Sequence, residues 1–251
     1  MPRLRAAGRW GSGRAMKAPI ALLALLAAPA LAEPPDEAAP AAAGAKASVS
    51  GGVVLLSDYR FRGISRSDGD PAVQGQITVS LPNGLYAGGR GASLKGVRAL
   101  GDAELDLYAG YGATVGSGTT LDAGLTYYAF PGGAGGSDYA EPYVSLSHSL
   151  GPVEATLGAK YAWSQAAIGG EDQLYLFGQI EGGIPLTPVT LTAEAGRQAS
   201  GRFGRYWNWS LGGRYAKGPL EAGLRYVDTD LRALPGRRSG AGVVASLGVR
   251  F

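Results

Sequence analysis

The stretch 241-AGVVASLGVRF-251 carries an apolar side chain at every second position, from Ala241 to Phe251. The positions between them hold Gly, Ser and Arg besides Val244, so only one side of the segment is apolar throughout. Successive side chains of a β-strand point to opposite faces, whereas a helix would group every third or fourth residue. The segment therefore predicts a strand with one apolar and one polar face.

The same alternation recurs along most of the chain. It predicts clear strands at 73–81, 105–113, 121–128, 153–163, 189–196, 207–215, 220–226 and 241–251, and weaker ones at 49–57, 85–93, 139–150 and 173–184. About twelve strands result, the even number that places both ends of a single-chain barrel on one side of a membrane.

The connections between these strands alternate in length. Short turns are expected at 82–84, 116–118, 151–152, 185–188 and 218–219, and longer loops at 59–70, 94–101, 131–138, 164–171, 200–206 and 229–240. Barrels of the bacterial outer membrane show this asymmetry, with short turns in the periplasm and long loops outside. The alternation therefore favours a membrane barrel.

The polar faces indicate what the barrel encloses. Their ionisable residues form the expected pore lining, which is Arg90, Glu104, Asp106, Asp122, Glu154, Lys160, Glu181, Glu194, Arg214, Glu221, Arg225 and Arg250. So many charges cannot build a dry core, because an unpaired buried charge costs several kcal/mol. The apolar faces must then point outward into hydrocarbon, where ring closure gives every strand two hydrogen-bonded neighbours. We therefore expect an all-β fold, a closed antiparallel transmembrane β-barrel with both termini in the periplasm.

Aromatic side chains gather beside the predicted long loops, as in the interfacial girdle of a membrane barrel. The expected girdle is Tyr127, Tyr161, Trp163, Trp207, Trp209 and Tyr226, and Phe130, Tyr139 and Tyr143 are placed in the same band. The alternative is the ordinary aromatic content of a soluble β-sandwich. Strand alternation and turn asymmetry together favour the girdle.

Residues 1–32 have the pattern of a cleaved signal peptide. Five basic residues between Arg3 and Lys17 precede an apolar run at 20–32 that ends in Ala-Leu-Ala. The run is too short to cross a bilayer as a helix, which counts against the alternative of an N-terminal membrane anchor. Met16 is an alternative start. Residues 33–47, rich in Ala and Pro, are expected to form a flexible leader, and residues 48–251 the barrel.

Charge and composition narrow the range of functions. The chain has 23 basic and 20 acidic residues, and removing the five basic residues of the signal peptide leaves 18 against 20, a net charge of −2. This balance favours no nucleic-acid partner. The chain has no Cys, and its single His, His148, is predicted to face outward. We therefore expect no enzyme, with no catalytic residues, cofactor or metal site.

The first predicted long loop carries a distinctive motif. It reads 57-SDYRFRGIS-65 and is followed by 70-DPAVQG-75. With Ser57, Asp58, Tyr59, Arg62, Gly63 and Ser65 as its marked positions, it resembles the opening motif of the TorF family of proteobacterial outer-membrane β-barrels. The similarity extends from Ser48 to Ser147 and includes 139-YAEPY-143. It implies a porin-type barrel in the outer membrane of a Gram-negative bacterium, but no substrate.

The charged residues of this loop, Asp58, Arg60, Arg62 and Arg66, leave two roles open. They can form a selective charged ring or an inward-folded constriction, or they can make ion pairs that hold the first outer loop in place. The sequence does not decide between these roles.

The function we expect is a porin-like channel for passive diffusion of small hydrophilic solutes or ions, whose preference the pore-lining charges set. The alternative is a plugged structural or adhesive barrel that acts through its outer loops. Phe251, with Val249 and Leu247, resembles the terminal signature that the outer-membrane assembly machinery recognises. The expected partners are that machinery, outer-membrane lipid, and the solutes or ions; the oligomeric state stays open.

Overall fold

The computed structural model describes residues 46–251, apart from 201–203, 232–233 and 235–237. The predicted signal peptide at 1–32 lies outside the described residues, as does nearly all of the predicted leader at 33–47. Both therefore stay predictions.

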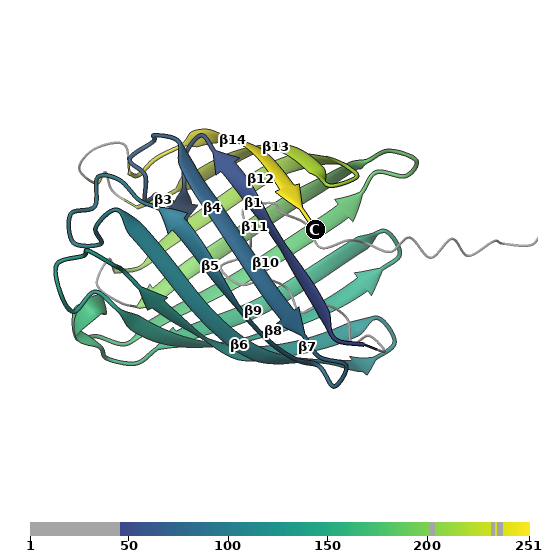
Figure 1. The fold of residues 1–251 in the computed structure, drawn as a ribbon, viewed down its shortest axis with the longest axis horizontal. Helices are drawn as coiled ribbons and strands as arrows, with labels where there is room; N and C mark the ends of the chain where they lie inside the picture. The colour runs from purple at the N-terminus through teal and green to yellow at the C-terminus, as the bar shows by residue number, and fades with distance from the viewer. Residues whose placement is uncertain (1–45, 201–203, 232–233, 235–237) are drawn as a thin grey trace, which may run out of the picture.

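Twelve antiparallel strands form a closed barrel (Figure 1). Their bounds are β1 Ser48–Leu56, β4 Ala72–Ser80, β5 Leu85–Ser93, β6 Ala103–Gly116, β7 Thr119–Ala129, β8 Tyr139–Leu150, β9 Val153–Ala162, β10 Gln173–Gly183, β11 Val189–Ser200, β12 Tyr206–Lys217, β13 Leu220–Thr229 and β14 Gly242–Arg250. Strand β1 pairs with β4 on one side and with β14 on the other, which closes the ring. The predicted closed antiparallel barrel is thereby confirmed.

Three short elements lie outside the barrel wall. Strands β2 (Arg60–Phe61) and β3 (Ile64–Ser65) form a hairpin of their own, and the 3-10 helix η1 (Ala166–Ile168) lies between β9 and β10. No helix among the described residues is long and apolar enough to cross a membrane.

The two ends of the barrel differ in their connections. Brief turns join β4 to β5, β6 to β7, β8 to β9, β10 to β11 and β12 to β13, at what we call the short-turn end. The opposite end, the long-loop end, carries the connections 57–71, 94–102, 130–138 and 163–172 among others. Five of the six connections at the long-loop end have more residues than any turn at the short-turn end, as predicted, but the connection between β11 and β12 has five residues, as many as the turn between β10 and β11.

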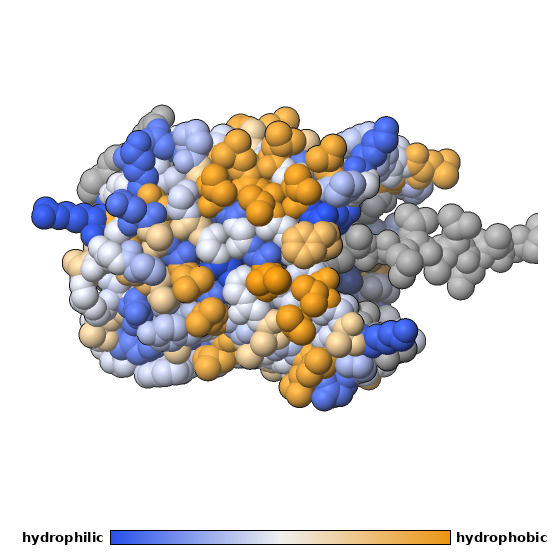
Figure 2. Space-filling model, viewed as in Figure 1, coloured by the Kyte–Doolittle hydropathy of each residue, from blue (hydrophilic) through white to orange (hydrophobic). Residues whose placement is uncertain are grey.

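Apolar side chains cover the outside of the wall. Leu105, Leu191 and Leu247 are 41%, 49% and 61% exposed. Figure 2 shows apolar residues gathered over the middle of the barrel, with hydrophilic residues toward its two ends. A continuous apolar surface of this kind is unusual on a soluble monomer. The polar faces of the strands therefore point inward, as the charge argument requires.

Glycines let aromatic rings lie flat against the inner wall. Gly110 of β6 stands opposite Tyr86 of β5, and a Cβ at Gly110 would lie 2.4 Å from the Tyr86 hydroxyl oxygen. Gly124 of β7 stands opposite Tyr143 of β8, where the corresponding distance is also 2.4 Å. Any larger residue at either position would displace the ring. The inner face of β5 to β8 is therefore lined by close-packed tyrosines.

Candidate functional site

The loop 57–71, between β1 and β4, folds into the barrel at its long-loop end. Its residues from Asp58 to Ser67 are buried except for half-buried Ile64. The β2–β3 hairpin turns at Arg62 and Gly63, whose φ angles are 51° and 81°, a region that glycine adopts without strain. A Cβ at Gly63 would lie 2.8 Å from Cβ of Asn208 on β12. The tip of the hairpin therefore packs directly on the barrel wall.

Arg62 fastens this tip to the far side of the barrel. Its Nη2 lies 2.5 Å from Oε2 of Glu141 on β8, and its Nη1 donates to Oε1 of Gln198 on β11 at 3.3 Å. The guanidinium group also lies over the ring of Tyr175 on β10, 4.2 Å from the centroid. In the ring of strands, β8, β10 and β11 lie across from β1 and β4. The loop thus spans the interior.

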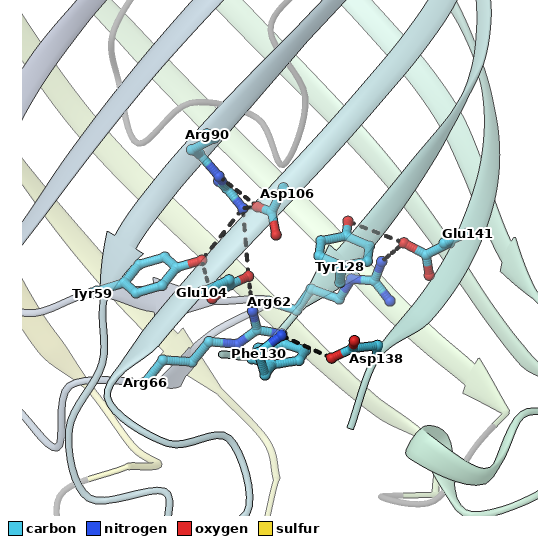
Figure 3. A network of polar contacts seen from close by, with 10 residues as sticks. All are labelled: Tyr59, Arg62, Arg66, Arg90, Glu104, Asp106, Tyr128, Phe130, Asp138 and Glu141. Atoms are coloured by element: carbon cyan, nitrogen blue, oxygen red, sulfur yellow. Dashed lines mark hydrogen bonds and ion pairs between the residues drawn. The ribbon is translucent and has the colours of Figure 1, made fainter. Parts of the chain in front are cut away.

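On the nearer side, Arg66 and Tyr59 join the loop to β5 and β6 (Figure 3). Arg66 forms an ion pair with Glu104, and the Tyr59 hydroxyl donates to Oε2 of Glu104 at 3.1 Å. Arg90 lies 3.8 Å from Glu104 and donates from Nε to Asp106 at 2.8 Å. Positively and negatively charged side chains therefore alternate from Arg66 in the loop to Asp106 in the wall.

Burial and neighbouring charges shift the pKa values of two residues of the loop. The pKa of Tyr59 lies well above its usual value, chiefly because burial disfavours the phenolate; Arg90 lowers this pKa and Glu104 raises it. Burial alone would lower the pKa of Arg66, but Glu104, Tyr59 and Tyr139 together raise it well above the usual value. Tyr59 is therefore a neutral donor and Arg66 a cation.

Asp58 organises the loop from within. It accepts hydrogen bonds from Nε of Arg60 at 2.6 Å and from Oγ of Ser65 at 2.5 Å. Ser57 continues the seam between β1 and β14, since its backbone N–H donates to the carbonyl oxygen of Ala245 at 2.9 Å. The residues of the sequence motif are therefore parts of one folded unit.

The loop charges take both roles that the sequence left open. The loop folds inward and narrows the barrel, and Asp58, Arg60, Arg62 and Arg66 all form ion pairs. Each of these four residues is buried. The arginines therefore hold the constriction together rather than form a ring exposed to water.

Aromatic packing fills the space around the loop. Phe61 meets Tyr128 edge to face with 5.8 Å between centroids, and Tyr139 stacks on Tyr128 at 4.6 Å. Phe130 belongs to the same buried cluster, and Tyr143 is buried in a second one. The prediction that Phe130, Tyr139 and Tyr143 join the outer girdle is therefore wrong. Two of them occupy inward positions of β8, and Phe130, just after β7, continues the inward parity of Thr126 and Tyr128.

The six other aromatic residues expected in the girdle are exposed on the outer surface. They are Tyr127, Tyr161, Trp163, Trp207, Trp209 and Tyr226. The hydroxyl of Tyr127 donates to Asp138 at 3.2 Å, and that of Tyr161 to Asp172 at 2.7 Å. Rings with one polar edge suit a boundary between hydrocarbon and water. Their membrane role stays a prediction.

The predicted pore-lining residues lie on inward positions, but water reaches only some of them. Those that are buried are Arg90, Glu104, Asp106, Asp122, Lys160, Arg214 and Glu221. Those that are half-buried are Glu181, Glu194, Arg225 and Arg250, and Glu154 is exposed. Arg214 lies 3.1 Å from Glu221 and 3.7 Å from Glu181, and Arg250 lies 2.8 Å from Glu221. Ion pairing is therefore extensive on the inner face.

Sequence reasoning missed Glu141 and Gln198, the two side chains that receive Arg62. Both lie on the inward side of their strands. The outward parity of Val144 and Leu146 on β8 places Glu141 inside, so this residue could have been found by extending the alternation toward the loop. No local signal shows that a loop arginine would reach it.

Comparison with known proteins identifies solved structures that have a similar fold. No curated protein sequence matches this chain. Among solved structures, the KdgM porin is similar at a TM-score of 0.57 with 11% identity, covering 80% of this chain and 98% of that chain. The NanC porin is similar at a TM-score of 0.54 with 14% identity, covering 81% of this chain and 99% of that chain. These similarities show a shared barrel fold.

A second KdgM structure, described as a complex with disordered oligogalacturonate, is similar at a TM-score of 0.55 with 11% identity, covering 81% of this chain and 97% of that one.

The family of the chain is identified by sequence similarity. The profile of Gcw_chp, described as a bacterial protein of unknown function, matches residues 39–241, which include the loop 57–71 and the strands β1 to β13. The chain therefore belongs to the Gcw_chp family of bacterial proteins of unknown function.

Proposed function

We propose that the mature chain is a porin-like channel in the outer membrane of a Gram-negative bacterium and passes small hydrophilic solutes or ions by passive diffusion. The observation that carries this proposal is a polar inner wall within reach of water. Gln179, Glu194, Ser210 and Ser246 point inward from four strands and are half-buried. Together with the apolar outer surface, this wall suits a barrel that separates hydrocarbon from a hydrated interior.

The loop 57–71 supplies the constriction of the proposed channel. It fills the long-loop end, so the narrowest part of any passage lies beside or through it. Ion pairs and hydrogen bonds hold it, rather than continuous strand pairing with the wall. We propose that the rate of permeation depends on how far this loop moves out of the passage.

The orientation and partners follow from the same proposal. Long loops would face outside, and both termini and the short turns would face the periplasm. The backbone of Phe251 pairs with that of Gly51 in both directions, at 2.9 Å and 3.0 Å, so the last residue completes the β1–β14 seam. This supports recognition of the last strand by the outer-membrane assembly machinery. The opening motif supports placement within the TorF family.

The charges of the inner face indicate which class of solute the proposed channel would pass. One similar structure, KdgM, is described as a complex with oligogalacturonate, a polyanion. In this chain carboxylates and guanidinium groups share the inner face. We therefore propose small hydrophilic solutes rather than a dedicated polyanion path.

Planar-bilayer recording of the refolded mature chain, residues 33–251, tests the channel. We expect discrete current steps in KCl and size-limited swelling of liposomes in sugar solutions. A folded protein that inserts into the bilayer but carries no current in repeated trials would contradict the proposal.

A plugged barrel that acts through its outer loops is the second candidate. It is favoured by the deep burial of the Arg62–Glu141 pair, whose side chains are 3% and 0% exposed. Replacing residues 60–65 by a Gly/Ser linker separates the two functions. In a channel the wild type conducts and the variant conducts more, whereas in a plugged barrel only the variant conducts.

A further inference from the structure

The inner wall divides into two parts that differ in their contact with water. On β4 to β7 the inward charged side chains Arg90, Glu104, Asp106 and Asp122 are buried, whereas the neutral Gln76 and Thr120 are half-buried. On β9 to β14 Lys160, Arg214 and Glu221 are buried, but Glu154, Gln179, Glu181, Glu194, Ser210 and Arg250 are half-buried or exposed. The hydrated space is therefore not centred on the barrel axis.

Tyrosine rings cover the wall of β4 to β7. The Tyr86 hydroxyl donates to Asp122 at 2.7 Å and is hydrogen-bonded to the Tyr143 hydroxyl. The Tyr108 hydroxyl lies 2.5 Å from Oγ1 of Thr78. These three rings form one buried cluster, and glycines in the neighbouring strands let them lie against the wall. A permeating ion would have to displace the rings to touch Asp122.

The wall of β9 to β14 keeps its charges within reach of water. The side chains of Glu181 and Arg250 are 27% and 22% exposed. Glu154 and Glu181 stand directly opposite each other on β9 and β10, so two carboxylates share one level near the short-turn end. The half-buried Arg250 lies on β14, at the other side of this wall.

We propose that the passage runs off-axis along β9 to β14, and that Glu154, Glu181 and Arg250 set its ion preference. A charge screened by water acts on a permeating ion mainly from within about a Debye length. Arg90, Glu104 and Asp106 are paired with one another and with Arg66, so their opposite charges largely cancel, and Asp122 lies behind the hydroxyl of Tyr86. The charges of β4 to β7 then stabilise the barrel and do not select ions. This inference rests on the proposed channel function.

Matched substitutions on the two walls test it. Glu181→Gln and Asp122→Asn each replace an inward carboxylate by an amide of the same shape. Reversal potentials under a KCl gradient should show that Glu181→Gln lowers the cation-to-anion permeability ratio by roughly twofold, the size expected for one charge screened by water. Arg250→Gln should raise the ratio, and Asp122→Asn should leave it unchanged. Heat-modifiable migration on gels confirms that each variant is folded.

A second measurement does not depend on current. The chain has no Cys, so Glu181→Cys and Asp122→Cys each introduce a single thiol. In the folded barrel a charged, water-soluble thiol reagent should label position 181 rapidly and position 122 slowly. Equal labelling at both positions, or equal shifts in reversal potential, would overturn the off-axis passage. Correct labelling without any current would instead reject the channel function and leave the hydrated wall in place.

Discussion

A buried ion pair joins the loop tip to the far wall. Arg62 and Glu141 lie on segments far apart in the sequence, and their nitrogen and oxygen are 2.5 Å apart. Removing one partner of a buried pair leaves the other charge uncompensated, at a cost of about 3–5 kcal/mol. The pair therefore works as a latch for the loop 57–71.

We expect Glu141→Gln to release the hairpin tip. Arg62 would move toward water, which exposes the arginines of the loop to trypsin, and the channel current should become larger or noisier. Cleavage between β1 and β4, followed by gel and mass analysis, measures the release. Glu171→Gln is the control, because Glu171 is exposed in the connection between β9 and β10. Equal trypsin resistance of wild type and Glu141→Gln would show that this pair is not the latch.

Strand parity predicts the direction of a side chain, but not what covers it. Glu104 and Glu181 were predicted as equivalent pore-lining residues, and both lie on the inner face. Glu104 is buried beneath Tyr59 and Arg66 of the loop, whereas Glu181 stays half-buried. The difference comes from a segment that is distant in sequence, so no pattern within either strand carries it.

At the level of elements, tyrosine rings pack against glycines on the inner face of the paired strands β5 and β6. A Cβ at Gly110 would lie 2.4 Å from the hydroxyl oxygen of Tyr86 and 2.8 Å from that of Tyr143. The three nearest atoms belong to the side chains of Tyr86 and Tyr143, so these rings must tilt away from an added Cβ. The absence of a side chain at Gly110 therefore lets the rings lie against the inner face of these strands.

Gly110→Ala should destabilise the barrel by about 1–3 kcal/mol, the usual cost of overpacking. Combining it with Tyr86→Ala should cost less than the sum of the single changes, because the clash disappears with the ring. Urea unfolding followed by tryptophan fluorescence measures both. Gly116→Ala on the same strand is the control, since nothing lies within 4 Å of its added Cβ. Strict additivity of the two changes would argue against the ring-on-glycine contact.

The barrel strands could be predicted from the sequence, but the β2–β3 hairpin could not. Period-two alternation over seven or more residues marks the long strands, because each must present one apolar and one polar face. Strands β2 and β3 have two residues each, and all four residues are buried except half-buried Ile64. Their position depends on Asp58 and on ion pairs to distant strands. The alternation of apolar and polar residues along a strand cannot predict such contacts.

In the whole molecule, apolar and polar side chains are distributed over the two surfaces of the wall in the reverse of the usual order for a soluble barrel. Large apolar side chains face outward around the ring, while buried ion pairs and tyrosines fill much of the interior. The predicted pore lining treated all inward charges alike. The inward loop and the tyrosine wall reduce the hydrated space to the side of β9 to β14.

This arrangement predicts that the outer surface tolerates leucine but not charge. Leu211 lies at the middle of β12 and is 63% exposed, so on a soluble protein Leu211→Arg would cost little, within about 0.5 kcal/mol. In a bilayer the same change should cost roughly 2–4 kcal/mol near the midplane. Leu186→Arg is the matched control, because Leu186 is fully exposed in the short turn between β10 and β11. Reversible unfolding in liposomes should show a loss of stability for the first variant alone; equal stability of both would mean that hydrocarbon does not surround this wall.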